Sequence, residues 1–175
     1  CFNFLMNQAF LFLVFISVQL SALATPSSSD SRLTYDISGA QGSYKRGESY
    51  QEITLGLNWF LQDWLIWRNS AFQRQGTNIN SIYGLDSSMR LQQEWLNNER
   101  TLGFKIFDGP GVRVASADSN AAFGEAGIGF RLGGLNLGAG IKSLHYFKNR
   151  DDKDGFLLPK DENQIFFTIS GGGNL

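Results

Sequence analysis

The sequence is poor in the residues that hold together small disulfide-rich or metal-binding proteins. It contains one cysteine (Cys1), one histidine and three prolines among 175 residues. A chain whose N-terminus is removed would have no thiol, which excludes disulfides and cysteine-ligated metals. The glycine run at 171–173 does not open a helix that could bind a phosphate. We therefore expect no cofactor and no metal site, and a net charge of −1 gives no reason to expect a nucleic-acid partner.

Charged residues are also missing from the start of the chain, where the first is Asp30. The stretch Ala9–Ala24 is almost wholly apolar and ends in Ala-Leu-Ala, a pattern that signal peptidase cuts. It is shorter than the roughly 20 apolar residues of a membrane-spanning helix. We predict a signal peptide at 1–24, a flexible mature N-terminus at 25–32 and one domain at 33–175. The alternative is that the segment is retained as an anchor.

Apolar and polar residues alternate through most of the remaining sequence. Between Ala122 and Leu132, the even positions are apolar or small, whereas the odd positions include Glu125 and Arg131. Successive side chains of a strand point to opposite faces, so this period of two predicts strands with one apolar and one polar face. The predicted strands are Leu33–Tyr44, Tyr50–Leu61, Trp64–Arg74, Ile82–Gln93, Thr101–Phe107, Ala121–Leu132, Leu135–Phe147 and Gln164–Asn174.

The connections between these strands alternate in character. Those at 62–63, 94–100 and 133–134 are short, whereas 45–48, 75–81, 108–120 and 148–163 are mostly longer and more polar. The pair Gly133-Gly134 is a strong two-residue hairpin signal, because such turns need positive φ angles. Short turns at one end and long loops at the other are typical of outer-membrane barrels. The expected fold is an all-β, eight-stranded antiparallel up-and-down transmembrane β-barrel.

These features resemble the small bacterial outer-membrane barrels of the OmpA, OmpX and OmpW type. The final strand is the best local match, since Phe167, Ile169 and Leu175 keep the alternation of an assembly signal, although Leu175 stands in place of the usual terminal phenylalanine. The resemblance implies a bacterial outer-membrane location and a monomer. It also implies contact with outer-membrane lipid and lipopolysaccharide, and recognition of the C-terminal strand by the assembly machinery.

Alternation alone does not say which face of the barrel is outside. A soluble lipocalin-like barrel has the same strand rhythm with its apolar face inward. Trp59, Trp64 and Trp67 surround the turn at 62–63, and Trp95 lies at another short turn. Such clusters are typical of aromatic girdles at a membrane–water boundary, although ordinary core or rim aromatics give the same pattern. We favour the membrane and expect the Leu85/Met89 face outward and the Asp86/Arg90 face inward.

A charged face that lines a narrow lumen must be neutralised. Unpaired charges there would be costly, so we predict ion pairs that cross an interior just large enough to be filled by side chains. The alternative is a transport or small-ligand barrel with an open path, either OmpW-like or lipocalin-like. The predicted lining residues are Asp36, Asp86, Arg90, Lys105, Glu125, Arg131 and Lys142, with Arg68 as a possible member.

Two further motifs suggest chemistry, and we expect neither to be functional. His145 and Ser143 share a face and resemble the serine–histidine pair of PagL-type lipid A deacylases in reversed order, with Glu162 as a conceivable acid. The stretch Arg150–Gly155 resembles part of a calcium loop but lacks its first carboxylate. We therefore expect a non-enzymatic barrel whose longer loops have a structural or surface-interaction role.

Overall fold

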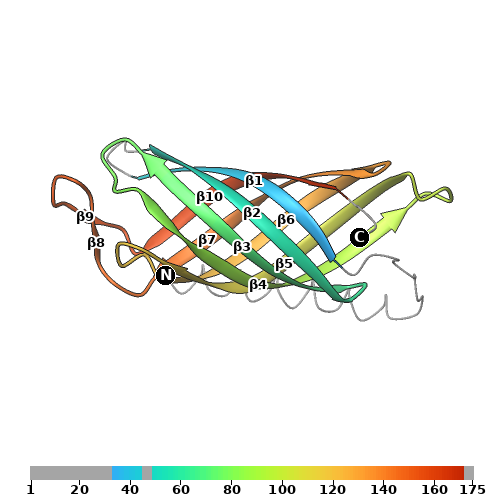
Figure 1. Ribbon diagram of the computed structural model, residues 1–175, viewed down its shortest axis with the longest axis horizontal. Helices are drawn as coiled ribbons and strands as arrows, with labels where there is room; N and C mark the ends of the chain where they lie inside the picture. Colours follow the sequence, from blue (N-terminus) through green and yellow to red (C-terminus); the bar gives the residue numbers. More distant parts are fainter. Residues whose placement is uncertain (1–32, 45–48, 172–175) are drawn as a thin grey trace, which may run out of the picture.

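The computed structural model describes residues 33–44 and 49–171, which form a closed antiparallel barrel of eight long strands (Figure 1). The order around the barrel is β1-β10-β7-β6-β5-β4-β3-β2, and β1 closes it by pairing with both β10 and β2. The strands are β1 (Leu33–Ser43), β2 (Ser49–Gln62), β3 (Leu65–Gly76), β4 (Ile82–Leu96), β5 (Leu102–Ala115), β6 (Ala121–Leu132), β7 (Leu135–Tyr146) and β10 (Asp161–Gly171).

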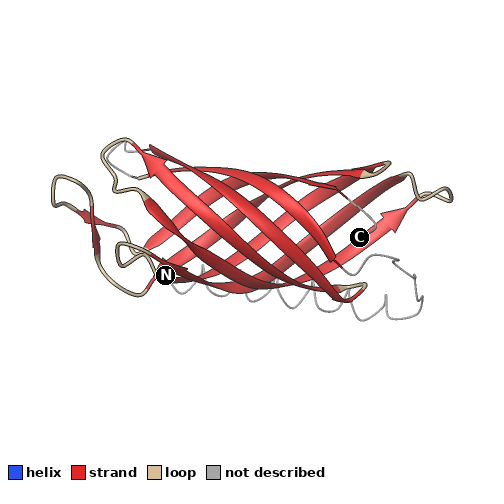
Figure 2. Cartoon of the chain, viewed as in Figure 1, coloured by secondary structure: helices blue, strands red, loops and turns tan. Residues whose placement is uncertain are grey.

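The described ranges consist of strands and their connections only (Figure 2). Two short strands, β8 (Arg150–Asp151) and β9 (Leu157–Leu158), pair within the long connection between β7 and β10. In residues 33–44 and 49–171 no helix reaches the length and hydropathy needed to cross a membrane. Leu33 and Gly171 lie at the end of the barrel that carries the short turns, opposite the longer loops.

The alternation in the sequence becomes an alternation of exposure. In β2, every second residue from Tyr50 to Asn58 is buried, and the residues between them are exposed. The exposed positions are the apolar ones: in β4, Leu85 is 63% exposed and Asp86 is 2% exposed. Leu85 and Met89 therefore point outward, as predicted, and the barrel is apolar outside and polar inside.

The interior contains a few aromatic rings as well as charges, and glycines make space for them. Phe107 and Phe166 pack with Ala40, and their ring centroids are 6.2 Å apart. A Cβ added at Gly127 would lie 2.5 Å from the ring of Phe107, and one at Gly140 would lie 2.6 Å from the ring of Phe166. These glycines are needed because the facing rings occupy the volume of their side chains.

The eight predicted strands are confirmed, and the main errors concern where they end. β6 runs from Ala121 to Leu132 as predicted, and Gly133 has the positive φ angle expected for its hairpin. The assignment of 108–120 to a loop is wrong for 108–115, because β5 continues to Ala115, and only 116–120 connect it to β6. The final strand begins earlier than predicted, at Asp161. The predicted signal peptide, the segment 25–32 and Leu175 lie outside the described residues.

Candidate functional site: the charged interior of the barrel

A continuous chain of six alternating charges runs through the interior, and each charge comes from a different strand. Every side chain in it is at most 6% exposed. The consecutive N–O distances are 2.8, 2.9, 2.7, 2.7 and 2.9 Å. The order is Glu162, Arg74, Glu52, Arg113, Asp86 and Lys142, hereafter the six-residue network.

The links of this network cross the lumen. Glu52 on β2 pairs with Arg113 on β5, and Asp86 on β4 pairs with Lys142 on β7, although neither pair of strands is adjacent in the barrel. Three acidic and three basic groups make the network neutral. Buried charges are tolerated when they are paired and hydrogen-bonded in this way, so the network fills this part of the lumen without leaving a net charge.

Arg113 is the centre of the network. Its Nη1 and Nη2 donate to the two oxygens of Glu52 at 3.0 and 2.7 Å, while Nε and Nη2 donate to Asp86 at 2.7 Å each. The guanidinium also lies over the ring of Phe72, 3.8 Å from its centroid. A planar guanidinium can satisfy two carboxylates and an aromatic face together, whereas an ammonium cannot.

The loop end of the interior is closed by tyrosines around Glu162. Tyr44 and Tyr50 both donate hydroxyl hydrogen bonds to its carboxylate, and Arg150 from β8 lies 3.5 Å away. Burial raises the pKa of Tyr44, which lies beyond the end of β1, above its ordinary value. Tyr44 therefore stays protonated and remains a donor to Glu162 at neutral pH.

Two further ion pairs lie closer to the short-turn end of the barrel than the six-residue network. Arg68 donates to Asp36 through Nε and Nη2 at 3.0 and 2.7 Å, and Asn58 donates to the same carboxylate. Arg90 contacts Glu125 with both groups largely buried, at 2.7 Å. A small cavity lies between these pairs and the six-residue network, and its lining combines charged and polar side chains such as Arg68, Arg90 and Glu125 with the apolar Ala40 and Phe166.

The seven charged residues predicted for the lumen all belong to its lining but differ in pairing. Asp36, Asp86, Arg90, Glu125 and Lys142 are in the ion pairs above, and Arg68 joins them. Arg131 pairs with Glu94 at 3.1 Å nearer the short turns, where both are partly exposed. Lys105 packs its stem toward Gly129, and within the described ranges no carboxylate lies within 4.0 Å of its amine.

Four members of the six-residue network were missed as lumen residues by the sequence reasoning. One of them, Glu162, was considered only as a hydrolase acid and lies in a stretch assigned to a loop. Glu52 and Arg74 lie in predicted strands, at the inward positions of the period-two pattern, so that pattern could have found them. Arg113 lies in the stretch assigned to a loop, and its orientation could be predicted only once β5 was extended.

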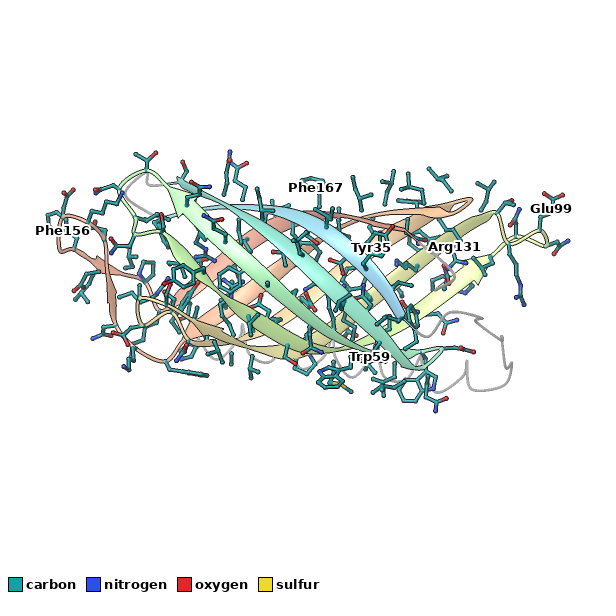
Figure 3. The ribbon with its side chains drawn as sticks, in the orientation of Figure 1. Tyr35, Trp59, Glu99, Arg131, Phe156 and Phe167 are labelled. Carbon is teal, nitrogen blue, oxygen red and sulfur yellow. The ribbon has the colours of Figure 1, made fainter. Side chains whose placement is uncertain are left out.

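Trp59, Trp67 and Trp95, predicted to form a girdle, point outward from strands near the short-turn end, and Trp64 lies in the turn between β2 and β3. Their exposed fractions range from 38% for Trp64 to 48% for Trp59 and Trp95. Trp59 stacks against Trp67, whose Nε1 donates to Ser87 at 3.0 Å. Figure 3 shows Trp59 on the outside, with Phe156 and Glu99 at opposite ends of the molecule.

The conceivable hydrolase residues separate between the two faces. Ser143 and His145 point outward, whereas Glu162 points into the lumen and binds Arg74, so the choice of Glu162 as the acid is wrong. The neighbouring residue Asp161 points outward instead, and its Oδ1 lies 2.7 Å from Nδ1 of His145. Among the described residues, no hydrogen bond joins Ser143 to His145, so a nucleophile–base contact is missing from this arrangement.

The calcium-like stretch has its own internal bonding. Asp152 accepts hydrogen bonds from the backbone N–H groups of Asp154 and Phe156, and Arg150 is buried against Tyr146. Residues 33–44 and 49–171 contain no cluster of three or more histidine, cysteine or acidic side chains placed to hold a metal. The carboxylate of Asp152 is thus used to order the loop between β8 and β9.

Comparison with known proteins supports the fold. No protein-family model and no curated protein matches the sequence. The crystal structure of Neisserial surface protein A (NspA) superposes with a TM-score of 0.53 and 10% identity, over 79% of this chain and 94% of that one. The outer-membrane enzyme PagL (16% identity, 77% and 97% covered) and a designed transmembrane β-barrel (9%, 84% and 98%) each have a TM-score of 0.49. The predicted resemblance to small eight-stranded outer-membrane barrels is confirmed as a likeness of fold.

Proposed function

We propose that this protein is an integral barrel of the bacterial outer membrane with a structural or surface-interaction role. Its outer face would contact lipid, and its interior would hold the barrel together without conducting solutes. The longer loops would contact lipopolysaccharide or another surface component.

The observation that carries this proposal is the inverted distribution of polarity. Ile53, Leu55 and Leu57 in β2 are 50 to 61% exposed, while the neighbouring Glu52, which points into the lumen, is 1% exposed. A soluble barrel would expose the charged face and bury the apolar one. An apolar exterior is stable only where lipid or another apolar surface covers it, which argues against the lipocalin-like alternative.

The interior supports a filled barrel over a transport path. Solute passage would require the links from Glu52 to Arg113 and from Asp86 to Lys142 to separate, since both cross the lumen. Breaking buried pairs leaves uncompensated charges and costs about 3–5 kcal/mol each. The network therefore favours a static, stabilising interior.

The loop between β7 and β10 supports a surface role because it is ordered and bears exposed apolar side chains. Asn78, from the loop between β3 and β4, donates to Asp154 and accepts a backbone hydrogen bond from Lys153. The loop presents Phe156 and Leu157 at 50 and 70% exposure. A fixed apolar tip with surrounding charges suits contact with a partner surface.

Expression in a Gram-negative host tests the proposal. We expect the protein in the outer-membrane fraction, in vesicle flotation and in heat-modifiable migration on unboiled gels. Replacing 152–157 with a glycine–serine linker should leave these properties intact and reduce binding to immobilised lipopolysaccharide. Recovery of the parent as a soluble periplasmic protein would refute the membrane location, and unchanged binding after loop replacement would refute the role of the loop.

A further inference from the structure

A carboxylate lies in the middle of the apolar outer face. Asp108 alternates with the inward-facing residues Phe107 and Gly109, so it points away from the lumen. It is six residues from the start of β5 and seven from its end. Its cross-strand partners, Leu91 on β4 and Ala126 on β6, are apolar. Asp108 therefore lies near the mid-height of the face proposed to contact lipid.

The carboxylate of Asp108 is incompletely satisfied. Its Oδ1 is buried and has no hydrogen-bond partner in the part of the chain that the structure describes. An unpaired carboxylate near the centre of a bilayer is costly, and ionisable residues at such depths ordinarily have a partner. The other oxygen, Oδ2, is not among the buried unpartnered atoms and also takes part in none of the hydrogen bonds found among the described residues, so a donor outside the barrel can reach the carboxylate there.

The same outer face carries a complementary group. Asn69 on β3 points outward and is partly exposed, and its side chain takes part in none of the hydrogen bonds found among the described residues. It lies seven residues before the end of β3, as Asp108 does in β5. Its cross-strand partner is Ser87, four residues along β4 from Leu91, the partner of Asp108.

The tilt of the strands brings these two groups to similar depth. Strands of a small barrel are inclined by about 40° to its axis, so a cross-strand row rises from one strand to the next. The four-residue offset between Ser87 and Leu91 on β4 corresponds to about 10 Å of height, against a rise of about 6 Å over the two steps from β3 to β5. Asn69 and Asp108 thus flank β4 at depths that differ by about 4 Å.

We propose that two copies of the protein associate side by side through the outer face of β3, β4 and β5. The Nδ2 group of Asn69 in each copy would donate to Asp108 of the other. A two-fold axis along the membrane normal keeps each residue at the same depth in both copies. In such a dimer a residue of one copy faces a different residue of the other, so Asn69 of each copy can face Asp108 of its partner. The inference rests on the membrane location proposed above and replaces the monomer expected from the sequence.

The surface beside Asp108 permits close approach. Its neighbours on the outer face are Pro110, the next outward residue of β5, and Gly124 and Ala126 on β6, and a Cβ added at Gly124 would meet nothing within 4 Å. Small residues at an intramembrane contact allow two backbones to come near enough for hydrogen bonds. Met89, midway between the two polar groups on β4, lies near the proposed axis.

Cross-linking of single-cysteine variants in lipid vesicles tests the dimer. We expect Met89→Cys to cross-link to itself in the mature chain, while Phe167→Cys on β10, four strands away in either direction, does not. Adding Asp108→Leu to Met89→Cys should reduce dimer formation roughly tenfold, because two symmetric hydrogen bonds are lost. Asp108→Asn keeps an acceptor and should retain most of the dimer.

Flotation of each variant with the vesicles is measured first. Protein that does not float contradicts the membrane location, and the inference fails with it. Floating protein overturns the dimer alone if Met89→Cys stays monomeric or cross-links no better than Phe167→Cys. Cross-linking that Asp108→Leu leaves unchanged overturns the proposed pairing.

Discussion

Arg113 shows at the residue scale how the interior depends on paired charge. Replacement by leucine would leave Glu52 with Arg74 and Asp86 with Lys142, but it would remove four hydrogen bonds and one unit of positive charge. Three carboxylates would then face two basic groups. The uncompensated negative charge stays buried, so the replacement should cost more stability than the loss of the hydrogen bonds alone.

We predict that Arg113→Leu lowers the free energy of unfolding by about 3 kcal/mol or more. Arg131→Leu is the matched control, because its pair with Glu94 is partly exposed and should contribute less than about 1 kcal/mol. Urea unfolding of refolded protein, followed by tryptophan fluorescence, measures both. Equal losses for the two variants would show that burial of the network does not determine its contribution.

At the element scale, β5 explains where sequence reasoning failed. Asp108, Pro110 and the glycines around them break the alternation, so this stretch resembles a loop. The stretch is still a strand because both neighbouring strands pair with it. Its pairing with β6 is unbroken, whereas its pairing with β4 stops at Ser88 and resumes at Leu91. Proline lacks the N–H that this ladder would use. By contrast, β6 has an unbroken pattern, and its bounds were predictable.

The close approach of β4 and β5 gives a test at Gly109. A Cβ added there would lie 2.0 Å from the backbone oxygen of Met89, so the strands would have to separate. We predict that Gly109→Ala destabilises the barrel by about 1–3 kcal/mol. Gly124→Ala, where a Cβ meets open space, should be neutral or stabilising by up to about 1 kcal/mol.

The same urea titration distinguishes these two alanine variants. A similar unfolding midpoint for both would mean that β4 and β5 can move apart without cost at Gly109. The close packing described for this pair of strands would then not constrain the barrel.

At the scale of the whole molecule, sequence reasoning identified part of the lumen lining but not which of its side chains form ion pairs with each other. Alternation placed Asp86, Glu125 and Lys142 on one face, and the need for neutrality predicted ion pairs. Which acid meets which base depends on strand order and shear, because Glu52 and Arg113 are 61 residues apart and lie on non-adjacent strands. The outward orientation of Asp108 could not be predicted for a related reason, since it depends on the register in which β5 pairs with its neighbours.

The central claim is that the apolar face of this barrel contacts lipid. Trp59, Trp67 and Trp95 lie on that face near the short turns, and Trp64 lies in the adjoining turn, so native fluorescence reports on this part of the surface without substitution. Quenching of reconstituted protein by lipids brominated at defined depths is the most direct measurement. We predict strong quenching that is greatest for bromine near the headgroups and weak quenching by aqueous acrylamide. Efficient quenching by acrylamide, with none by any brominated lipid, would contradict the account.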